Sequence, residues 1–272
     1  MKTISKSVTL TGEALHSGNL VVITIAPSSK EGIRFIYNHD VVDITVDALV
    51  DGTERATQVT NGVTTINTPE HFLSACYALS LTNIDVTLSH DEFPILDGSS
   101  RGFIAALLPL CVDAPEEDVR PEYCVKADMG WRSHRSEYHA FPYDGLRIDA
   151  IVSYPSRWVQ TVAYHYIHSL DAYQREIASA RTYGFTDELE MLREKGLAQG
   201  GNLGNALIIT DTGYMNEPRF PDEMVRHKIL DFIGDMAVVF GSIKGHFVLV
   251  RPSHHGNAVV AKSMWQHLNR LY

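Results

Sequence analysis

The segment from Asp222 to Gly241 constrains the fold strongly, because it combines a regular apolar stripe with regularly spaced polar side chains. An α-helix repeats every ~3.6 residues, so side chains three and four positions apart share one face. The apolar positions follow that spacing: Met224, Val225, Ile229, Phe232, Ile233 and Met236. The pattern therefore predicts a helix over 222–241 whose apolar face packs into a core.

The same helix would carry His227, Asp231 and Asp235 one turn apart. An imidazole and a carboxylate at this spacing can hold one divalent ion, and zinc accepts both ligand types. The alternative is an ordinary His–Asp pair, which stabilises a helix by roughly 0.2–0.5 kcal/mol. Taken alone, the H-x-x-x-D spacing favours the alternative, because two ligands do not make a zinc site.

A third ligand is available in residues 68–71, which open a second predicted helix with the sequence T-P-E-H. Thr68 suits the N-cap and Pro69 the first helical position. A hydrolytic zinc centre needs three protein ligands, an open position for water and a nearby general base. The predicted ligands are His71, His227 and Asp231. Glu70 would be the base, unless it merely favours the helix N-terminus through the helix dipole.

Further motifs lie before, between and after these segments. They are Gly12-Glu13-Ala14-Leu15-His16-Ser17-Gly18, Pro94-Ile95-Leu96-Asp97-Gly98-Ser99, Ala180-Arg181-Thr182-Tyr183-Gly184-Phe185, Ile233-Gly234-Asp235 and Arg251-Pro252-Ser253-His254. With the E-H pair at 70–71 and the H-K-I-L-D run at 227–231, they resemble in order the UDP-3-O-acyl-N-acetylglucosamine deacetylases (LpxC). This family comprises the zinc enzymes of lipid A biosynthesis in Gram-negative bacteria. The resemblance covers most of the chain, except a stretch from about 111 to 179.

The resemblance implies the chemistry of the metal site. His71, His227 and Asp231 would bind Zn²⁺, although iron(II) can occupy the same ligands. Glu70 would be the general base that activates the water held by the metal. The implied reaction is hydrolysis of an acetamide.

The resemblance also implies how the reaction is completed and how the substrate is held. Thr182 would donate to the oxyanion that forms when water attacks the carbonyl, where such donors act most strongly. His254 would stabilise that charge as a cation and protonate the leaving amine, with Asp235 orienting its ring. Lys228 would contact the sugar nucleotide, and Tyr183 would add a hydroxyl near the oxyanion.

Some of these assignments leave alternatives. An ordinary strand or turn hydroxyl would also explain Thr182. His254 is followed by His255, and we prefer His254 because the late family motif reaches it without a gap. Ala14 and Ser253 stand where the family usually has glycine, which bears on substrate fit more than on the chemistry.

Composition excludes several other classes of protein. The chain has 272 residues with 23 basic and 33 acidic side chains, a net charge of −10, which argues against nonspecific nucleic-acid binding. No apolar run approaches the ~20 residues of a membrane span, and the N-terminus lacks an apolar signal core. Cys76, Cys111 and Cys124 show neither metal-ribbon nor redox spacing. A cytoplasmic protein without an evident obligate protein partner is therefore predicted.

The predicted strands and helices do not alternate regularly, which favours an α+β fold over a doubly wound sheet. Strands are predicted at 3–10, 20–27, 32–37, 84–90, 122–128, 146–152, 158–166 and 246–251, and helices from residue 68 and near 101–110, 171–178, 222–241 and 257–269. The acidic stretch 113–118 is the predicted linker. The resemblance implies two similar two-layer α/β sandwich domains, residues 1–118 and 119–272, packed together with the zinc site between them.

The segment 186–211 is predicted to contain a short helix and then a strand. Its apolar residues, punctuated by glycines, are Leu189, Met191, Leu192, Leu197, Leu203, Leu207 and Ile208. The residues alone favour a helix–strand unit of the core. The resemblance instead implies an insert that forms an apolar passage for an acyl chain, with Leu203 and Leu207 contacting it.

The sequence thus predicts a zinc-dependent amidohydrolase that removes acetyl from a UDP-linked, 3-O-acylated glucosamine. One alternative is a zinc deacetylase acting on a different acylated amino sugar. The other is a catalytically silent sugar-nucleotide-binding protein of the same fold. The presence of the whole set Glu70, His71, His227, Asp231 and His254 weighs against a silent protein.

Overall fold

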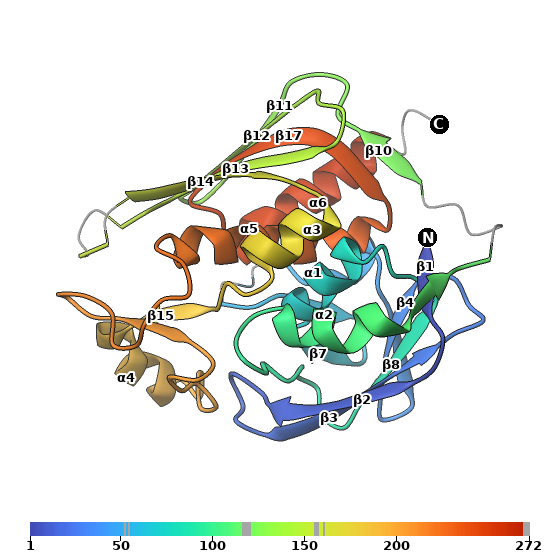
Figure 1. Ribbon diagram of the computed structural model, residues 1–272, viewed down its shortest axis with the longest axis horizontal. Coiled ribbons are helices and arrows are strands. Elements are labelled where there is room, and N and C mark those ends of the chain that lie inside the picture. The colour runs from blue at the N-terminus through green and yellow to red at the C-terminus, as the bar shows by residue number, and fades with distance from the viewer. Residues whose placement is uncertain (52, 54, 116–120, 155–157, 160, 269–272) are drawn as a thin grey trace.

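The computed structural model describes every residue except 52, 54, 116–120, 155–157, 160 and 269–272. Two β-sheets form the outer layers, and most of the helices lie between them (Figure 1). The predicted α+β class is confirmed, because strands and helices are interspersed without regular alternation.

The five-stranded sheet comes from the N-terminal part of the chain, in the spatial order β2-β3-β8-β4-β5. Its strands are β2 (Val8–Glu13), β3 (Leu20–Pro27), β4 (Ile33–Tyr37), β5 (Asp40–Asp43) and β8 (Ile84–Leu88). Val21, Ile23 and Ile25 of β3 are fully buried and alternate with more exposed neighbours. This alternation is expected of a sheet with one face on the core.

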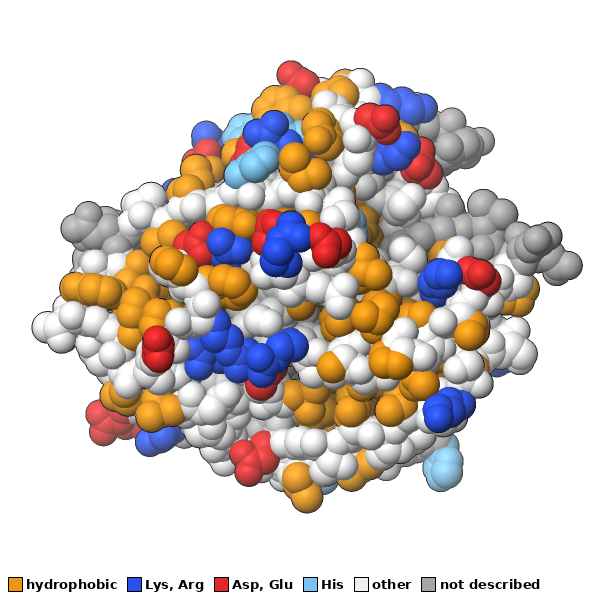
Figure 2. Space-filling view, in the orientation of Figure 1, with side chains coloured by type: hydrophobic (Ala, Val, Ile, Leu, Met, Phe, Trp, Pro, Cys, Tyr) orange, Lys and Arg blue, Asp and Glu red, His pale blue; other side chains and the backbone are white. Residues whose placement is uncertain are grey.

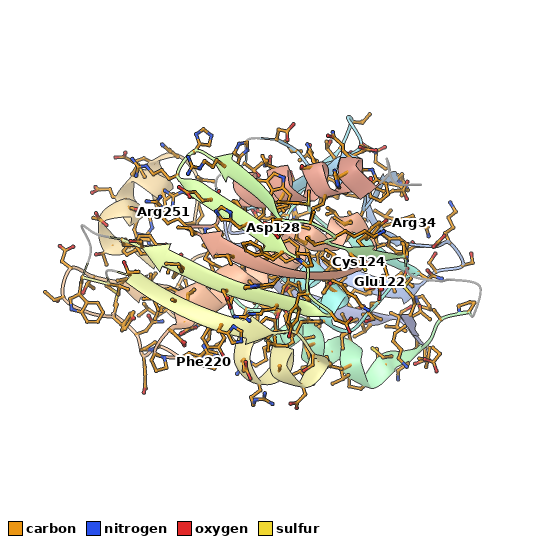
Figure 3. All side chains as sticks on the ribbon, turned by 90° about the horizontal axis from the view of Figure 1, so that it is seen from above. Arg34, Glu122, Cys124, Asp128, Phe220 and Arg251 are labelled. Atoms are coloured by element: carbon orange, nitrogen blue, oxygen red, sulfur yellow. The ribbon has the colours of Figure 1, made fainter. Side chains whose placement is uncertain are left out.

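The six-stranded sheet comes from the C-terminal part, in the order β11-β12-β17-β13-β14, with β10 pairing β17. Its strands are β10 (Glu122–Cys124), β11 (Met129–Ser133), β12 (Ser136–Phe141), β13 (Leu146–Ser153), β14 (Thr161–Ile167) and β17 (Ser242–Val250). Figure 3 looks down on this sheet, with Glu122 and Cys124 marking β10 and Arg251 following the far end of β17. Strand β17 is central, and Arg251 leads from it directly into the last helix.

The helices are α1 (Glu70–Ala78), α2 (Arg101–Leu107), α3 (Leu170–Ala172), α4 (Thr186–Glu194), α5 (Glu223–Met236) and α6 (His254–Leu268). Shorter 3₁₀ turns occupy Val46–Ala48, Leu108–Leu110 and Ala237–Val239. Within the described part of the chain there are also three two-stranded ladders: β1 (Lys2–Ile4) with β9 (Cys111–Asp113), β6 (Gln58–Thr60) with β7 (Thr65–Asn67), and β15 (Tyr183–Phe185) with β16 (Leu207–Ile209).

Helices α1 and α5 pack against each other between the two sheets (Figure 1). A Cβ atom added to Gly234 of α5 would lie 2.0 Å from the carbonyl oxygen of Glu70 in α1. Such a distance is far inside van der Waals contact, so the approach of the helices requires glycine here. The close approach brings the first turn of α1 alongside the polar face of α5.

Most predicted elements are present, with shifted ends. The strand predicted at 3–10 is two strands, β1 and β2, and the helix predicted near 171–178 is α3 followed by a π-helical turn over Tyr173–Ile177. The β11–β12 hairpin is absent from the sequence prediction. Its turn places His134 at positive φ (51°) without the glycine or asparagine that usually marks such a turn.

The first sheet and its ladders end by Asp113, and the second sheet begins at Glu122. The predicted boundary at 118–119 and residues 116–118 of the predicted linker lie outside the described residues, and Asp113 at the start of that linker belongs to β9. The division into domains 1–118 and 119–272 stays a prediction.

Basic, acidic and hydrophobic side chains are interspersed on the face drawn in Figure 2. Within the described residues, each helix is too short or too polar to cross a lipid bilayer. The cytoplasmic location inferred from the sequence stays a prediction.

Candidate functional site

The first turn of α1 is set by tertiary contacts and not by the predicted cap. Pro69 occupies the N-cap position, and Thr68 lies at positive φ (57°), which is unusual for a β-branched residue. The Thr68 N–H donates to the Thr57 carbonyl (2.9 Å), and its hydroxyl donates to Glu92 (3.4 Å). The prediction that Thr68 caps the helix is therefore wrong, because its polar groups are engaged elsewhere. Glu70 does lie in the first turn, as predicted.

Helix α5 buries more than its apolar stripe. All the predicted apolar positions are buried, but so are the polar side chains of His227, Asp231 and Asp235. Buried ionisable groups are expensive unless they are paired or bind a metal. Their partners come from α1, α6 and the segment before β6, and so from widely separated parts of the sequence.

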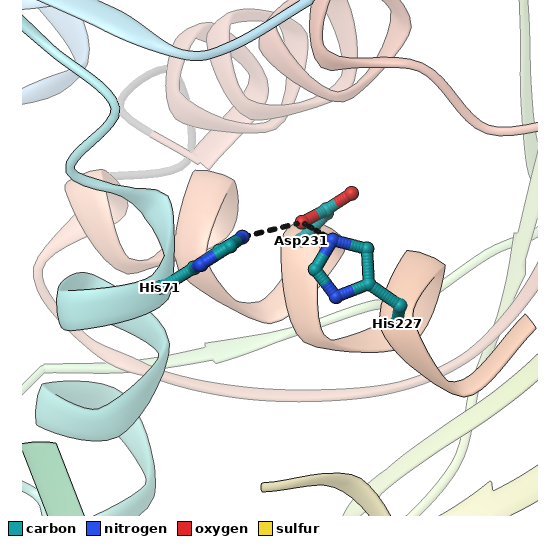
Figure 4. Close-up of side chains that lie close together, drawn as sticks. All are labelled: His71, His227 and Asp231. Atoms are coloured by element: carbon teal, nitrogen blue, oxygen red, sulfur yellow. Dashed lines mark ion pairs between the residues drawn. The ribbon is translucent and has the colours of Figure 1, made fainter. Parts of the chain in front are cut away.

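The side chains of His71, His227 and Asp231 converge, and their ligand atoms lie within 4.8 Å of one another (Figure 4). Asp231 Oδ1 lies 3.2 Å from His227 Nε2 and 3.6 Å from His71 Nε2. The structure thus brings together the three predicted metal ligands, two from α5 and one from α1.

The hydrogen bonds around His227 and Asp231 fit a divalent cation. His227 Nδ1 donates to the Ala180 carbonyl (3.0 Å), which leaves the Nε2 lone pair directed at Asp231. A metal-binding histidine usually makes such a bond with its other nitrogen. Lys228 Nζ donates to Asp231 Oδ2 (2.8 Å), whereas Asp231 Oδ1 is buried without a hydrogen-bond partner among the described residues. Burial lowers the pKa of His227 to about 3, so the imidazole is neutral and able to bind a metal.

Glu70 lies beside this cluster. Its Oε2 accepts from the Thr57 N–H (3.3 Å), and its Oε1 is 4.0 Å from His254 Nε2. Burial raises the pKa of the Glu70 carboxyl to about 7, against the opposing effects of His254 and His71. A carboxylate whose pKa lies near neutrality is suited to accept and return a proton.

His254 begins α6 and faces Asp235. Its Nδ1 lies 3.0 Å from Asp235 Oδ2, while its Nε2 faces Asp231 Oδ2 at 3.8 Å. Burial works against the charged ring, but Asp235 and Asp231 outweigh it and raise the pKa of His254 to about 9. Between the two adjacent histidines, the structure places His254 in the site, and the ring of His255 packs near His134 (5.2 Å between centroids). His254 is therefore a buried cation near neutral pH.

A cavity of about 220 Å³ is lined by the three proposed metal ligands, Glu70 and His254, whereas Asp235 is not among its lining residues. Its lining also includes Thr182, Tyr183 and Lys228. Thr182 is held by two backbone hydrogen bonds, from its N–H to the Gly98 carbonyl and from the Leu207 N–H to its own carbonyl (both 2.8 Å). Gly98 has φ of 83°, and a Cβ there would lie 1.8 Å from the Asn205 carbonyl oxygen, so this approach also requires glycine.

Leu203 and Leu207 are not among the residues that line this cavity. Leu207 is 1% exposed and belongs to the hydrophobic core through β16, whereas Leu203 is 49% exposed on the surface. The helix and strand predicted within 186–211 are present as α4 and β16.

Sequence reasoning missed several residues at the site. The cavity is also lined by Leu15, Arg55, Tyr154 and Glu188. Arg55 and Glu188 form an ion pair (3.1 Å) that joins the segment before β6 to α4, and Tyr154 and Tyr183 share a hydroxyl–hydroxyl hydrogen bond (2.5 Å). Of these, only Leu15 lies within a motif quoted above, so no local pattern identified the others.

Comparisons with known proteins cover almost the whole chain. Residues 1–266 match the family model described as UDP-3-O-acyl N-acetylglycosamine deacetylase (LpxC). The chain is 34% identical to a UDP-3-O-acyl-N-acetylglucosamine deacetylase from Aliarcobacter butzleri, over 97% of this chain and 89% of that protein. It is 31% identical to a protein of the same name from Thermosynechococcus vestitus, over 97% of this chain and 94% of that protein.

Proposed function

Because the chain belongs to the UDP-3-O-acyl N-acetylglycosamine deacetylase family, we propose that it hydrolyses the N-acetyl group of a UDP-linked, 3-O-acylated N-acetylglucosamine and releases acetate. The relatives carry this substrate and activity in their names. The proposal places the protein in lipid A biosynthesis. The observation that carries it is the convergence of His71, His227 and Asp231 on a cavity that also holds Glu70 and His254.

We propose Zn²⁺ as the metal, held by His71, His227 and Asp231. Two imidazole nitrogens and one carboxylate oxygen form a ligand set that zinc uses in hydrolytic enzymes, and iron(II) suits the same atoms. The buried Asp231 Oδ1, without a hydrogen-bond partner among the described residues, supports a cation at this point. When bound, the ion supplies Lewis acidity toward the carbonyl and lowers the pKa of water.

Glu70 accepts the proton of the attacking water in this proposal. The Thr57 N–H holds its carboxylate, and Glu70 directly precedes the proposed ligand His71 in the first turn of α1. Thr182 also lines the cavity, and its hydroxyl would donate toward the negative charge that develops on the carbonyl oxygen.

His254 donates the proton that the leaving amine requires. The Asp235 carboxylate fixes the ring through Nδ1, so Nε2 faces the cavity with its proton. Lys228 binds the anionic part of the sugar nucleotide, although it also donates to Asp231, and its ammonium lies 5.6 Å from the centre of the Tyr183 ring. These roles use the chain's own groups for binding, proton transfer and charge stabilisation.

The proposal is tested by measuring metal content and acetate release together. Purified protein should contain about one metal ion per chain, and it should release acetate from the UDP-linked, 3-O-acylated substrate. Chelation should abolish release, and zinc or iron(II) should restore it. Acetate release from another acylated amino sugar, but not from the UDP-linked substrate, would show a zinc deacetylase with a different substrate. Stoichiometric binding of the UDP-linked substrate without acetate release would show a catalytically silent binding protein.

We predict that His254 and Asp235 act as a unit and give activity a bell-shaped pH dependence. Activity requires protonated His254, so it should fall as pH rises through about 9, the pKa that Asp235 and Asp231 impose against burial. Asp235→Asn removes a neighbouring charge and should lower both the rate and the apparent pKa of the basic limb. His254→Ala should be slow but retain metal. His255→Ala is the matched control and should be nearly normal; the reverse pattern would assign the role to His255.

We predict that the 186–211 segment recognises the acyl chain. A substrate lacking the 3-O-acyl group should react far more slowly, because remote binding energy orients the reacting centre. A tryptophan at Leu203, which is exposed, should impair long-chain substrates most, whereas Leu207 is unsuitable for this test because it packs in the core. Tryptophan at Val112 on β9, 41% exposed, is the control. Equal rates with and without the acyl group would refute the prediction that this segment recognises the acyl chain.

A further inference from the structure

We propose that Thr57 is a positioning residue. It holds the Asp235 carboxylate, and through it the His254 ring, in a fixed position relative to Glu70. The inference rests on the proposed function, because it assigns part of the same reaction to a residue outside every motif quoted above. Thr57 directly precedes β6 and is buried. Its hydroxyl contacts Asp235 of α5 and His254 of α6, so Thr57 links the segment before β6 to both helices.

The contacts of the Thr57 hydroxyl lead to Asp235 and His254. The hydroxyl donates to Asp235 Oδ1 in a short hydrogen bond, and its oxygen lies 3.1 Å from His254 Nδ1. The other oxygen of the carboxylate, Oδ2, accepts from Asn257 Nδ2 (2.8 Å) and faces His254 Nδ1 (3.0 Å). Thr57 thus determines which Asp235 oxygen remains for the imidazole.

The backbone of Thr57 leads to Glu70. Its N–H donates to Glu70 Oε2 (3.3 Å), and its carbonyl accepts from the Thr68 N–H (2.9 Å), two residues before Glu70. All the polar groups of this residue are therefore directed at the site. One residue fixes the proposed base through its backbone and the proposed acid through its side chain.

A hydroxyl is well suited to this position. It donates to Asp235 and can at the same time accept a share of the His254 Nδ1 proton. Without it, Asp235 Oδ1 would be a buried acceptor that has lost its donor, and the carboxylate could rotate away from the ring. The His254 ring would then lose its fixed direction, although the backbone hydrogen bonds of residue 57 to Glu70 and Thr68 would remain.

The activity test compares two substitutions at one position. Thr57→Val keeps the shape and the backbone bonds but removes the hydroxyl, so kcat should fall about 10–100-fold while KM and metal content stay near normal. Thr57→Ser restores the hydroxyl and should return kcat to within a few-fold of the wild type. Thr60→Val is the matched control on β6, since the hydrogen bonds of the Thr60 hydroxyl stay within its own hairpin: it donates to the Thr64 carbonyl (2.8 Å) and accepts from the Gly62 N–H (3.0 Å) and the Thr65 hydroxyl (3.2 Å). It should have normal kcat.

A second measurement does not depend on turnover. In metal-free, ¹⁵N-histidine-labelled protein, the Nδ1 proton of His254 can be assigned by its disappearance in His254→Gln. Its chemical shift should change in Thr57→Val and return in Thr57→Ser. If Thr57→Val fails to fold, Thr57→Ala serves the same comparison.

The proposal is overturned if Thr57→Val leaves both kcat and the His254 proton unchanged. It is also overturned if Thr57→Ser is as impaired as Thr57→Val, because the hydroxyl would then not be the acting group. Failure of the proposed function is a separate result. In that case the wild type releases no acetate, while the proton resonance still decides whether Thr57 orders the Asp235–His254 pair.

Discussion

Replacing His227 with alanine is expected to remove most of the bound metal and nearly all acetate release. His227 and Asp231 come from one helix, and their facing atoms are 3.2 Å apart. Loss of the imidazole leaves two of the three proposed ligands and opens the site to additional water. Loss of a partner that merely supports a ligand costs ~10–100-fold in affinity or activity, so loss of a ligand itself should cost more.

The measurement is metal content per chain, determined alongside turnover at saturating substrate. His139→Ala is a suitable control, because His139 is an exposed histidine on β12 of the six-stranded sheet. His71→Ala and Asp231→Ala should behave like His227→Ala. A His227→Ala protein with full metal occupancy would refute the ligand assignment, even if its activity were low.

The sequence predicted the parts of the site that lie in short local patterns. The spacing of His227 and Asp231 required only a helix, and the T-P-E-H run placed Glu70 and His71 in a first turn. The packing of α1 on α5 depends on Gly234, whose lack of a side chain admits the Glu70 carbonyl. A glycine in a helical pattern does not by itself reveal which backbone approaches it. The convergence of His71 with His227 and Asp231 therefore could not be predicted from local sequence patterns.

The misses have the same physical origin. The N-cap propensity of Thr68 is a local preference, and bonds to Thr57 and Glu92 override it. Thr57 acts through hydrogen bonds to residues 178 and 197 positions away in the sequence, which no periodicity encodes. Leu207 is apolar whether it packs in the core or contacts a ligand, and only its place in β16 showed that it is in the core.

Replacing Glu70 is expected to separate metal binding from chemistry. Glu70 is proposed as a base and not as a ligand, so Glu70→Ala should keep nearly stoichiometric metal while turnover falls by about 10²–10⁴, the usual contribution of a positioned acid or base. Glu70→Gln is the sharper variant, because it keeps the shape and can still accept from the Thr57 N–H. Near-normal turnover would assign the base elsewhere, and loss of metal would make Glu70 a ligand.

Stability of the metal-free protein gives Glu70 a second, independent readout. Burial raises the folded-state pKa from 4.5 to about 7, so the folded protein holds this proton more tightly than the unfolded chain. The free energy of unfolding should therefore fall as pH rises across that window, by up to about 3 kcal/mol from this group. Glu70→Gln cannot ionise and should lose this pH dependence, becoming more stable than the wild type above pH 7 when no metal is bound. Identical melting curves for the two proteins at pH 5 and pH 8 would contradict the buried, proton-holding carboxyl on which its role as a base depends.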